Sequence, residues 1–443
     1  MRTVYRGSSS QRIAPPAPAP TFGLPVVEAS GEVDTSRFVT GVAYIFAVLL
    51  VLRLLLTDSV LNQFINYTGE GGFILEKIHP CTQAIVLLLF ITLAKVKVSL
   101  TPSEALIIRQ MCILMAVIVA LVMLVQVMGR PIAIGYLLDT YIGACLVCFL
   151  MFALPLRHRR MIGHVIMAYL VVNSLVAIVE KATSFRLMPY PYVETVFRPT
   201  ALTAHPLAVG LFSAGGAAFT LATGWRPWVK GLALLAFLLG TAASGARTGL
   251  IFTTLSILGA LVLTDVGGQT GEQRLQRRLL LFGSMAFGGV LLFSIGLAAG
   301  FLERFEGGYI DENASARIDV YQVFDWVSWK DILFGADMLE IKAMVKDRLD
   351  LLIESSVVVF VFQFGLFGAI TLAATIFWTV WRISSASDWR GVVASVTFCA
   401  VAMSNDTLSG KHFHFAVLFL CLIAFRNNSH DHLGRRVRPN WEA

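Results

Sequence analysis

The sequence predicts an all-α protein of the polytopic membrane class, with about twelve transmembrane helices. Of its 443 residues, 56% are hydrophobic and only 14% are charged, and the mean hydropathy is +0.73. A soluble protein of this length could not cover its surface with so few polar side chains. Apolar runs of about 18 residues or more recur along the chain, and each is long enough to cross the hydrocarbon layer as a helix.

The composition divides the chain into five parts. Residues 1–36 are rich in Ala, Pro and Ser, so we expect a disordered cytoplasmic tail there. Transmembrane helices are expected within 37–301, a long periplasmic loop at 302–351, further transmembrane helices within 352–425, and a basic cytoplasmic tail at 426–443. The predicted spans are 38–56, 78–94, 105–128, 132–154, 161–180, 205–223, 229–243, 248–264, 279–301, 352–381, 391–404 and 413–425.

The basic residues set the orientation of these spans. They fall in the tails and in alternate loops, all on one side of the membrane if the spans alternate. The positive-inside rule then places both termini in the cytoplasm. The net charge of +7 is explained by these short loops, so nucleic acid is excluded as a partner and the lipid bilayer is expected. The residues concerned are Arg6, Arg12, Arg37, Lys95, Lys97, Arg157, Arg159, Arg160, Arg226, Lys230, Arg274, Arg277, Arg278, Arg382, Arg390, Arg426, Arg435, Arg436 and Arg438.

Three arginines lie in or beside the outward loops, where the same rule disfavours cations. They are Arg198, Arg247 and Arg317. The simplest interpretation is paired surface charge, for example between Arg317 and Asp319. The interpretation we favour is a shared anion site, because the planar guanidinium donates two parallel hydrogen bonds to phosphate and keeps its charge when partly desolvated.

Other candidate residues lie in the outward loops or inside the spans. Asp139 is expected in the outer part of the fourth span, and a buried ionisable group there is a functional candidate. Arg130 is equally plausible as its structural partner, whereas Arg53 is expected to extend to the membrane surface. The remaining outward candidates are His205, Glu354, Lys411, His412 and His414.

The long loop has a helical pattern of its own. Apolar residues recur at helical spacing from Ile318, with Trp326 and Trp329 nearby, which predicts a helix at the membrane interface. A second amphipathic helix is predicted at 338–350. For these aromatics we favour packing or membrane anchoring over sugar stacking.

Four segments resemble motifs of the bacterial O-antigen ligase and O-antigen polymerase superfamily, in the same order. Residues 198–208 (RPTALTAHPLA) are similar to its Arg-x-x-Gly…Asn-Pro-Asn segment, and 244–249 (SGARTG) to its Ser-x-Ser-Arg-Thr segment. Arg317 through Gly335, ending in DILFG, resembles its Arg…Trp…His-Pro-Leu-x-Gly-x-Gly loop, and 363–368 (QFGLFG) its Glu-x-Gly-Leu-x-Gly motif. The resemblance covers about residues 195–380.

This resemblance implies a GT-C-like fold in the bacterial inner membrane and a periplasmic active site. The substrate would be an oligosaccharide on undecaprenyl diphosphate, with a chain-length regulator as a further candidate partner. Such enzymes use no metal and no nucleotide-sugar cofactor, and the sequence contains no P-loop motif and no outward Asp-x-Asp.

The resemblance also assigns roles. Arg198, Arg247 and Arg317 would stabilise charge on the departing diphosphate. Glu354 is the first candidate for the base, followed by His205 or His412, and Lys411, His414 and Asp139 are secondary. Ligases carry His-Asn where this chain has Glu354-Ser355, which favours a polysaccharide repeat-unit polymerase over a ligase. From another class, a transporter or lipid-linked oligosaccharide flippase fits the predicted span count.

Overall fold

The computed structural model describes residues 31–69, 73–130, 134–190, 196–263, 312–404 and 406–426, together with parts of 271–283. The predicted ninth span (279–301) and almost all of both predicted tails lie outside this description. Within it, helices account for the regular structure and no strand occurs. The first described helix starts at Gly31, and the predicted division of the chain into tails, spans and loop stays a prediction.

The described residues form a series of helices. Their bounds are α1 (Gly31–Leu55), α2 (Asp58–Leu61), η1 (Ile74–Lys77), α3 (Pro80–Lys95), α4 (Pro102–Val127), α5 (Ile134–Tyr136), the π-helical turn η2 (Leu137–Ile142), α6 (Gly143–Ala153), α7 (Leu156–Thr183), α8 (Pro206–Thr220), α9 (Pro227–Ser244), α10 (Arg247–Leu263), α12 (Glu312–Asp319), η4 (Val320–Gln322), α13 (Val323–Trp326), α14 (Trp329–Phe334), α15 (Met338–Leu349), α16 (Ser356–Ser385), α17 (Trp389–Met403), η5 (Asp406–Leu408) and α18 (His414–Ala424).

The apolar helices confirm an all-α membrane protein. Within the described residues, 6 helical segments are long and apolar enough to cross a membrane, judged by length and composition: Ser36–Leu55, Pro102–Val127, Ile134–Ala153, Leu156–Thr183, Pro227–Ser244 and Ser356–Ser385. Shorter apolar helices are Pro80–Lys95, Pro206–Thr220, Trp389–Met403 and His414–Ala424. Every predicted span that falls in the described residues contains one of the helices. A count of twelve crossings remains a prediction.

Helix starts follow ordinary capping chemistry. α3, α4, α8 and α9 each begin with proline in the first turn, where its missing N–H removes no helical bond. At α4, Thr101 and Glu104 form a capping box. Glu104 also pairs with Arg159, whose guanidinium donates to two backbone carbonyls. Arg159, expected in a topology-setting loop, is therefore a buried structural residue.

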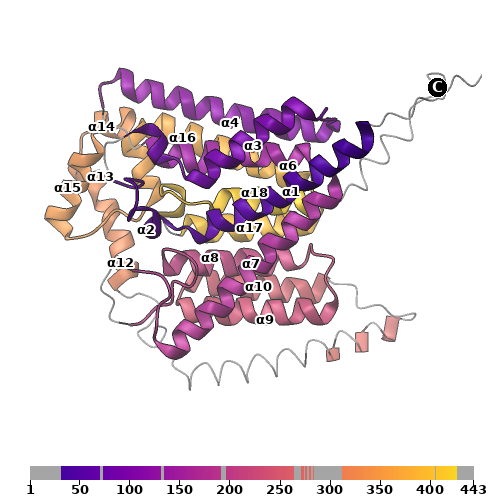
Figure 1. The fold of residues 1–443 in the computed structure, drawn as a ribbon. Coiled ribbons are helices and arrows are strands. Elements are labelled where there is room, and N and C mark those ends of the chain that lie inside the picture. The colour runs from indigo at the N-terminus through magenta and orange to yellow at the C-terminus, as the bar shows by residue number, and fades with distance from the viewer. Residues whose placement is uncertain are drawn as a thin grey trace, which may run out of the picture.

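Helix α18 lies at the centre of the bundle (Figure 1). All of its residues, His414–Ala424, are buried. A helix that is apolar on every side and covered on every side is a core element. Helices α6, α7, α16, α17 and α8 pack around it.

The helices of the long loop, α12 to α15, gather at one end of the bundle (Figure 1). The predicted helix at 338–350 is confirmed as α15. The helix predicted from Ile318 starts earlier, at Glu312, and reaches Trp326 through the 3-10 turn η4.

Two glycines dock the long loop onto α16. Gly365 has a φ of 74° inside α16, which interrupts the helical geometry, and Gly335 has a φ of 87° in the loop. The interruption leaves the Phe362 carbonyl available, and it accepts from the Ala336 N–H at 2.7 Å. A Cβ on Gly335 would lie 2.8 Å from that same carbonyl oxygen. The DILFG and QFGLFG segments, singled out by resemblance, are thus the two halves of one backbone contact.

Candidate functional site

Two segments carry the candidate residues at the end of the bundle nearest α12 to α15. We call residues 196–205, before α8, the arginine loop, and residues 407–414, before α18, the histidine turn. Phe212 of α8 contacts the His414 ring edge-on, with centroids 4.7 Å apart. Helix α8, which follows the arginine loop, therefore contacts the start of α18.

Buried polar side chains of α7 hold the arginine loop. Glu180, which is 3% exposed, accepts from the backbone N–H of Thr200 at 2.9 Å and of Ala201 at 2.8 Å. Asn173 accepts from the Leu202 N–H at 3.0 Å. These bonds hold Ala201 at a φ of 49°, a conformation that is costly for alanine. The loop is therefore a preset structure.

Arg198 extends from this loop to the turn between α9 and α10. Its Nε donates to the carbonyl of Ser244, the last residue of α9, at 3.1 Å. Gly245 follows in the left-handed conformation, with a φ of 67°, and α10 starts at Arg247. Two of the three predicted arginines thus meet at one turn, at the N-terminus of a helix. The side chain of Arg317 lies outside the described residues, so its participation remains a prediction.

A further arginine, which the sequence did not single out, braces the loop. The Arg186 guanidinium lies over the rings of Tyr190 and Phe197, at 4.6 Å and 4.7 Å from their centroids. It donates to the Arg198 carbonyl at 2.9 Å. Its charge therefore lies beside the predicted anion site.

His205 is committed to capping α8. Its Nδ1 accepts from the Leu207 N–H at 3.2 Å, and its Nε2 lies 3.3 Å from the Tyr190 hydroxyl. Both ring nitrogens are therefore occupied within the protein. This arrangement favours a structural role over the predicted role as base.

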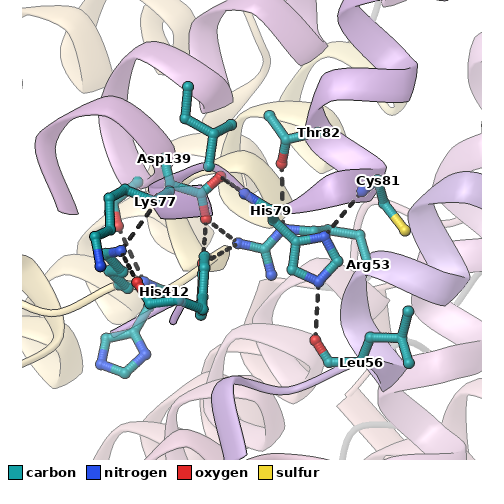
Figure 2. Close-up of polar contacts among 12 residues, drawn as sticks. Arg53, Leu56, Lys77, His79, Cys81, Thr82, Asp139 and His412 are labelled. Carbon is teal, nitrogen blue, oxygen red and sulfur yellow. Dashed lines mark hydrogen bonds and ion pairs between the residues drawn. The ribbon is translucent and has the colours of Figure 1, made fainter. Parts of the chain in front are cut away.

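A buried ion pair lies beside the histidine turn (Figure 2). Arg53 donates to Asp139 at 2.5 Å, and their side chains are 6% and 0% exposed. This geometry corrects two expectations. Arg53 does not extend to the surface, and Arg130 is not the partner of Asp139, because it donates to the Phe334 carbonyl at 2.6 Å. The sequence did not reveal the Arg53 pairing, because the two residues are far apart in the chain.

Neighbouring groups complete the bonding of Asp139. The Tyr67 hydroxyl donates to it at 2.5 Å and the His79 backbone N–H at 3.2 Å. Burial raises the pKa of Tyr67 well above its ordinary value, which keeps this hydroxyl protonated as a donor. Burial, with a contribution from Arg53, lowers the pKa of His79 to about 4, so His79 is neutral at physiological pH. Such pairing satisfies a carboxylate that would otherwise be costly to bury.

Lys411 ties the histidine turn to the loop after α2. Its amine donates to the Tyr67 carbonyl and, at 3.1 Å, to the Lys77 carbonyl. Burial lowers the pKa of Lys411 to about 8, and the negative charge of Asp139 opposes this shift. We therefore assign Lys411 a tethering role.

The histidine turn is anchored by consecutive side chains of η2. The Thr140 hydroxyl accepts from the His412 N–H at 3.0 Å and donates to the Gly410 carbonyl at 2.9 Å. The Tyr141 hydroxyl donates to the Leu408 carbonyl at 2.6 Å. The backbone on both sides of residue 411 is thereby fixed.

The His412 ring lies at the edge of this network, directed away from the ion pair (Figure 2). It stacks on the His414 ring, with centroids 4.8 Å apart, and it lies so close to Gly410 that a Cβ there would be 2.5 Å from Nε2. His412 is half-buried, and its two ring nitrogens form no hydrogen bond within the part of the chain that the structure describes. His414 is 4% exposed and starts a core helix, so it is not the accessible outward residue expected.

Glu354 is exposed on the segment that leads into α16. The next residue, Ser355, caps α16, and its hydroxyl lies 3.0 Å from that of Tyr321. Ser356 then accepts from Ser409 of the histidine turn at 3.2 Å. Glu354 and His412 therefore lie on segments that touch, whereas the sequence alone left them unrelated.

Among the described residues, no group of three or more His, Cys, Asp or Glu side chains is arranged to hold a metal ion. The two Cys in C-x-x-C spacing, Cys145 and Cys148, are both buried in α6. In comparisons with known proteins, no family model and no curated protein matches this chain.

Proposed function

We propose that the protein is a glycosyltransferase that polymerises oligosaccharide repeat units carried on undecaprenyl diphosphate. One observation carries this proposal. Arg198, on a preset loop, docks onto the turn at which Arg247 begins α10. Two guanidinium groups and a helix N-terminus together favour a diphosphate over a neutral ligand.

The chemistry needs only a base and a stabilised leaving group. The base takes the proton of an acceptor sugar hydroxyl, and the freed oxygen attacks the anomeric carbon of the donor glycan. The bond from that carbon to the diphosphate oxygen breaks, and undecaprenyl diphosphate leaves with the electron pair. The arginines offset the negative charge that develops on it.

His412 is the base that the geometry favours. It is half-buried, its backbone is anchored, and its ring nitrogens are unengaged within the described residues. His205 is committed to capping α8. Glu354 is exposed next to the same turn, and it remains the second candidate. A base must reach the hydroxyl proton within about 3 Å, directly or through one water.

The proposed setting is the bacterial inner membrane, with about twelve crossings in a GT-C-like arrangement and both termini cytoplasmic. The site then faces the periplasm, where the lipid-linked donor is presented. The gathering of α12 to α15, the arginine loop and the histidine turn near one end of the bundle supports a single working face.

The test replaces Arg198 and Arg247 singly by Ala and by Lys in cells that lack the native gene. We expect roughly a hundredfold less polymer for each Ala variant, because one donor to developing charge is lost. Lys should restore only part of it, because the amine lacks the planar fork. Arg382→Ala, at the opposite end of α16 and stacked on Trp378, is the matched control.

Mass spectrometry of the lipid-linked glycans in the deletion strain separates the alternatives. Single repeat units facing the periplasm, with no polymer, support a polymerase. Finished polymer still on its lipid would show a ligase, and units held on the cytoplasmic leaflet would show a flippase. Normal polymer in both Ala variants at normal protein levels would refute the anion site.

A further inference from the structure

We propose that Thr140 is a positioning residue that sets the place of the His412 ring. The inference rests on the proposed function, because it treats His412 as the acting base. Thr140 lies in the apolar span Ile134–Ala153 and has no ionisable group, so its sequence alone gives no sign of such a role.

The local backbone around Thr140 is unusual. Residues Leu137–Ile142 form a π-helical turn between α5 and α6. Such turns are rare, and they occur frequently at functional sites. Within this turn, Asp139, Thr140 and Tyr141 are all buried; Asp139 pairs with Arg53 of α1, and Thr140 and Tyr141 both bond to the histidine turn.

The Thr140 hydroxyl closes a clamp on the histidine turn. One oxygen accepts from the His412 N–H and donates to the Gly410 carbonyl, at 3.0 Å and 2.9 Å. The backbone of the residue between them is therefore held from both sides. Because the ring of His412 lies against Gly410 itself, a shift of this backbone moves the imidazole.

The Arg53–Asp139 ion pair fixes the position of the helical turn that carries Thr140. Asp139 precedes Thr140, and it is bonded to Arg53, Tyr67 and the His79 backbone. Moving η2 would break these buried bonds together, which costs more than moving a solvent-exposed loop. Asp139 thus supports the site through Thr140, without touching substrate.

The test compares Thr140→Val with Thr140→Ser in the full-length protein in nanodiscs. Valine has nearly the same shape but loses both bonds, whereas serine keeps the hydroxyl. We expect amide hydrogen exchange in the peptide 407–413 to rise roughly tenfold in Thr140→Val and to return to normal in Thr140→Ser. Polymer formation in cells should fall and recover in the same order.

Thr371→Val is the matched control. This exposed threonine of α16 donates to the Phe367 carbonyl in the ordinary helical manner, so both readouts should stay at the wild-type level. Gly410→Ala provides a second route if Thr140→Val does not accumulate. Its Cβ would displace the His412 ring without removing a buried hydroxyl, and Gly410 is not at positive φ.

Each outcome decides the inference. Unchanged exchange in Thr140→Val means that the clamp does not hold the turn, and it overturns the proposal. Faster exchange with full polymer formation also overturns it, because the ring position would then be irrelevant. If His412→Ala keeps full polymer formation while the exchange results hold, the proposed base fails and the structural clamp stands.

Discussion

At the residue scale, two buried carboxylates are each satisfied by several hydrogen-bond donors. Asp139 accepts from Arg53, Tyr67 and the His79 backbone, and Glu180 accepts from successive N–H groups of the arginine loop. Asp139 was a sequence candidate of the kind that marks function inside a membrane. In this structure, both carboxylates hold the backbone of neighbouring loops.

The neutral state of His79 predicts a pH dependence of stability. Its pKa is lowered to about 4 in the folded protein, against about 6.5 in an unfolded chain. Between these pH values the unfolded chain binds a proton that the folded protein does not. The contribution of His79 to the free energy of unfolding is therefore fully present above about pH 6.5 and is lost as the pH falls towards 4. The loss should approach about 3 kcal/mol.

Thermal unfolding in detergent from pH 7.5 to 4 measures this effect. His79→Gln removes the titrating ring. We expect this variant to be less stable than the wild-type protein at pH 7.5, but to lose less stability as the pH falls. A variant that loses stability with pH as steeply as the wild-type protein would rule out His79 as the source.

At the element scale, the interruption of α16 at Gly365 creates the site at which the long loop docks. Gly365 interrupts α16, and the freed carbonyl of Phe362 receives the long loop through Ala336. The glycine pair therefore connects the α12 to α15 region to the membrane-embedded bundle.

Gly365→Ala should release this connection. Alanine is strained at a φ of 74°, and its Cβ would lie 2.8 Å from the Phe334 carbonyl carbon. We expect a loss of about 1–3 kcal/mol, together with faster proteolysis within residues 312–350. Gly231→Ala, where a Cβ meets nothing within 4 Å, should leave both thermal stability and proteolysis unchanged. Equal proteolysis of the two variants would contradict the docking role.

The sequence predicted elements better than it predicted partners. Apolar runs located the helices, and amphipathic spacing located α15, because both signals are local. The partner of Asp139 was wrongly predicted, since Arg130 is nearer in sequence but Arg53 is nearer in space. Thr140 carried no signal, because a threonine in an apolar span has no distinctive chemistry until its two bonds are seen.

At the scale of the whole molecule, one end of the bundle collects the polar segments. There the histidine turn contacts the start of α16 and Phe212 of α8, the helix that follows the arginine loop, and Arg198 of that loop contacts the end of α9. Under the proposed function, the substrate would therefore reach the site from one side of the membrane only.

The side of the membrane that the candidate site faces can be measured. Fusing alkaline phosphatase, which is active only in the periplasm, after residue 336 should give active enzyme, whereas fusion after residue 386 should not. Arg382 and Arg390 flank the latter position, and the positive-inside rule places such loops in the cytoplasm. The reverse pattern would turn the site towards the cytoplasm and exclude a periplasmic polymerase.

The central position of α18 has a consequence for biogenesis. It follows every other helix that the structure describes, yet all of its residues are buried among them. During synthesis the earlier described helices therefore enter the membrane before the helix that fills their centre, and the insertion of α18 completes the core. Because α18 begins at His414, the last residue of the histidine turn, the same event brings His412 to its place. Under the proposed function, a chain that lacks α18 would therefore not act on the proposed lipid-linked substrate.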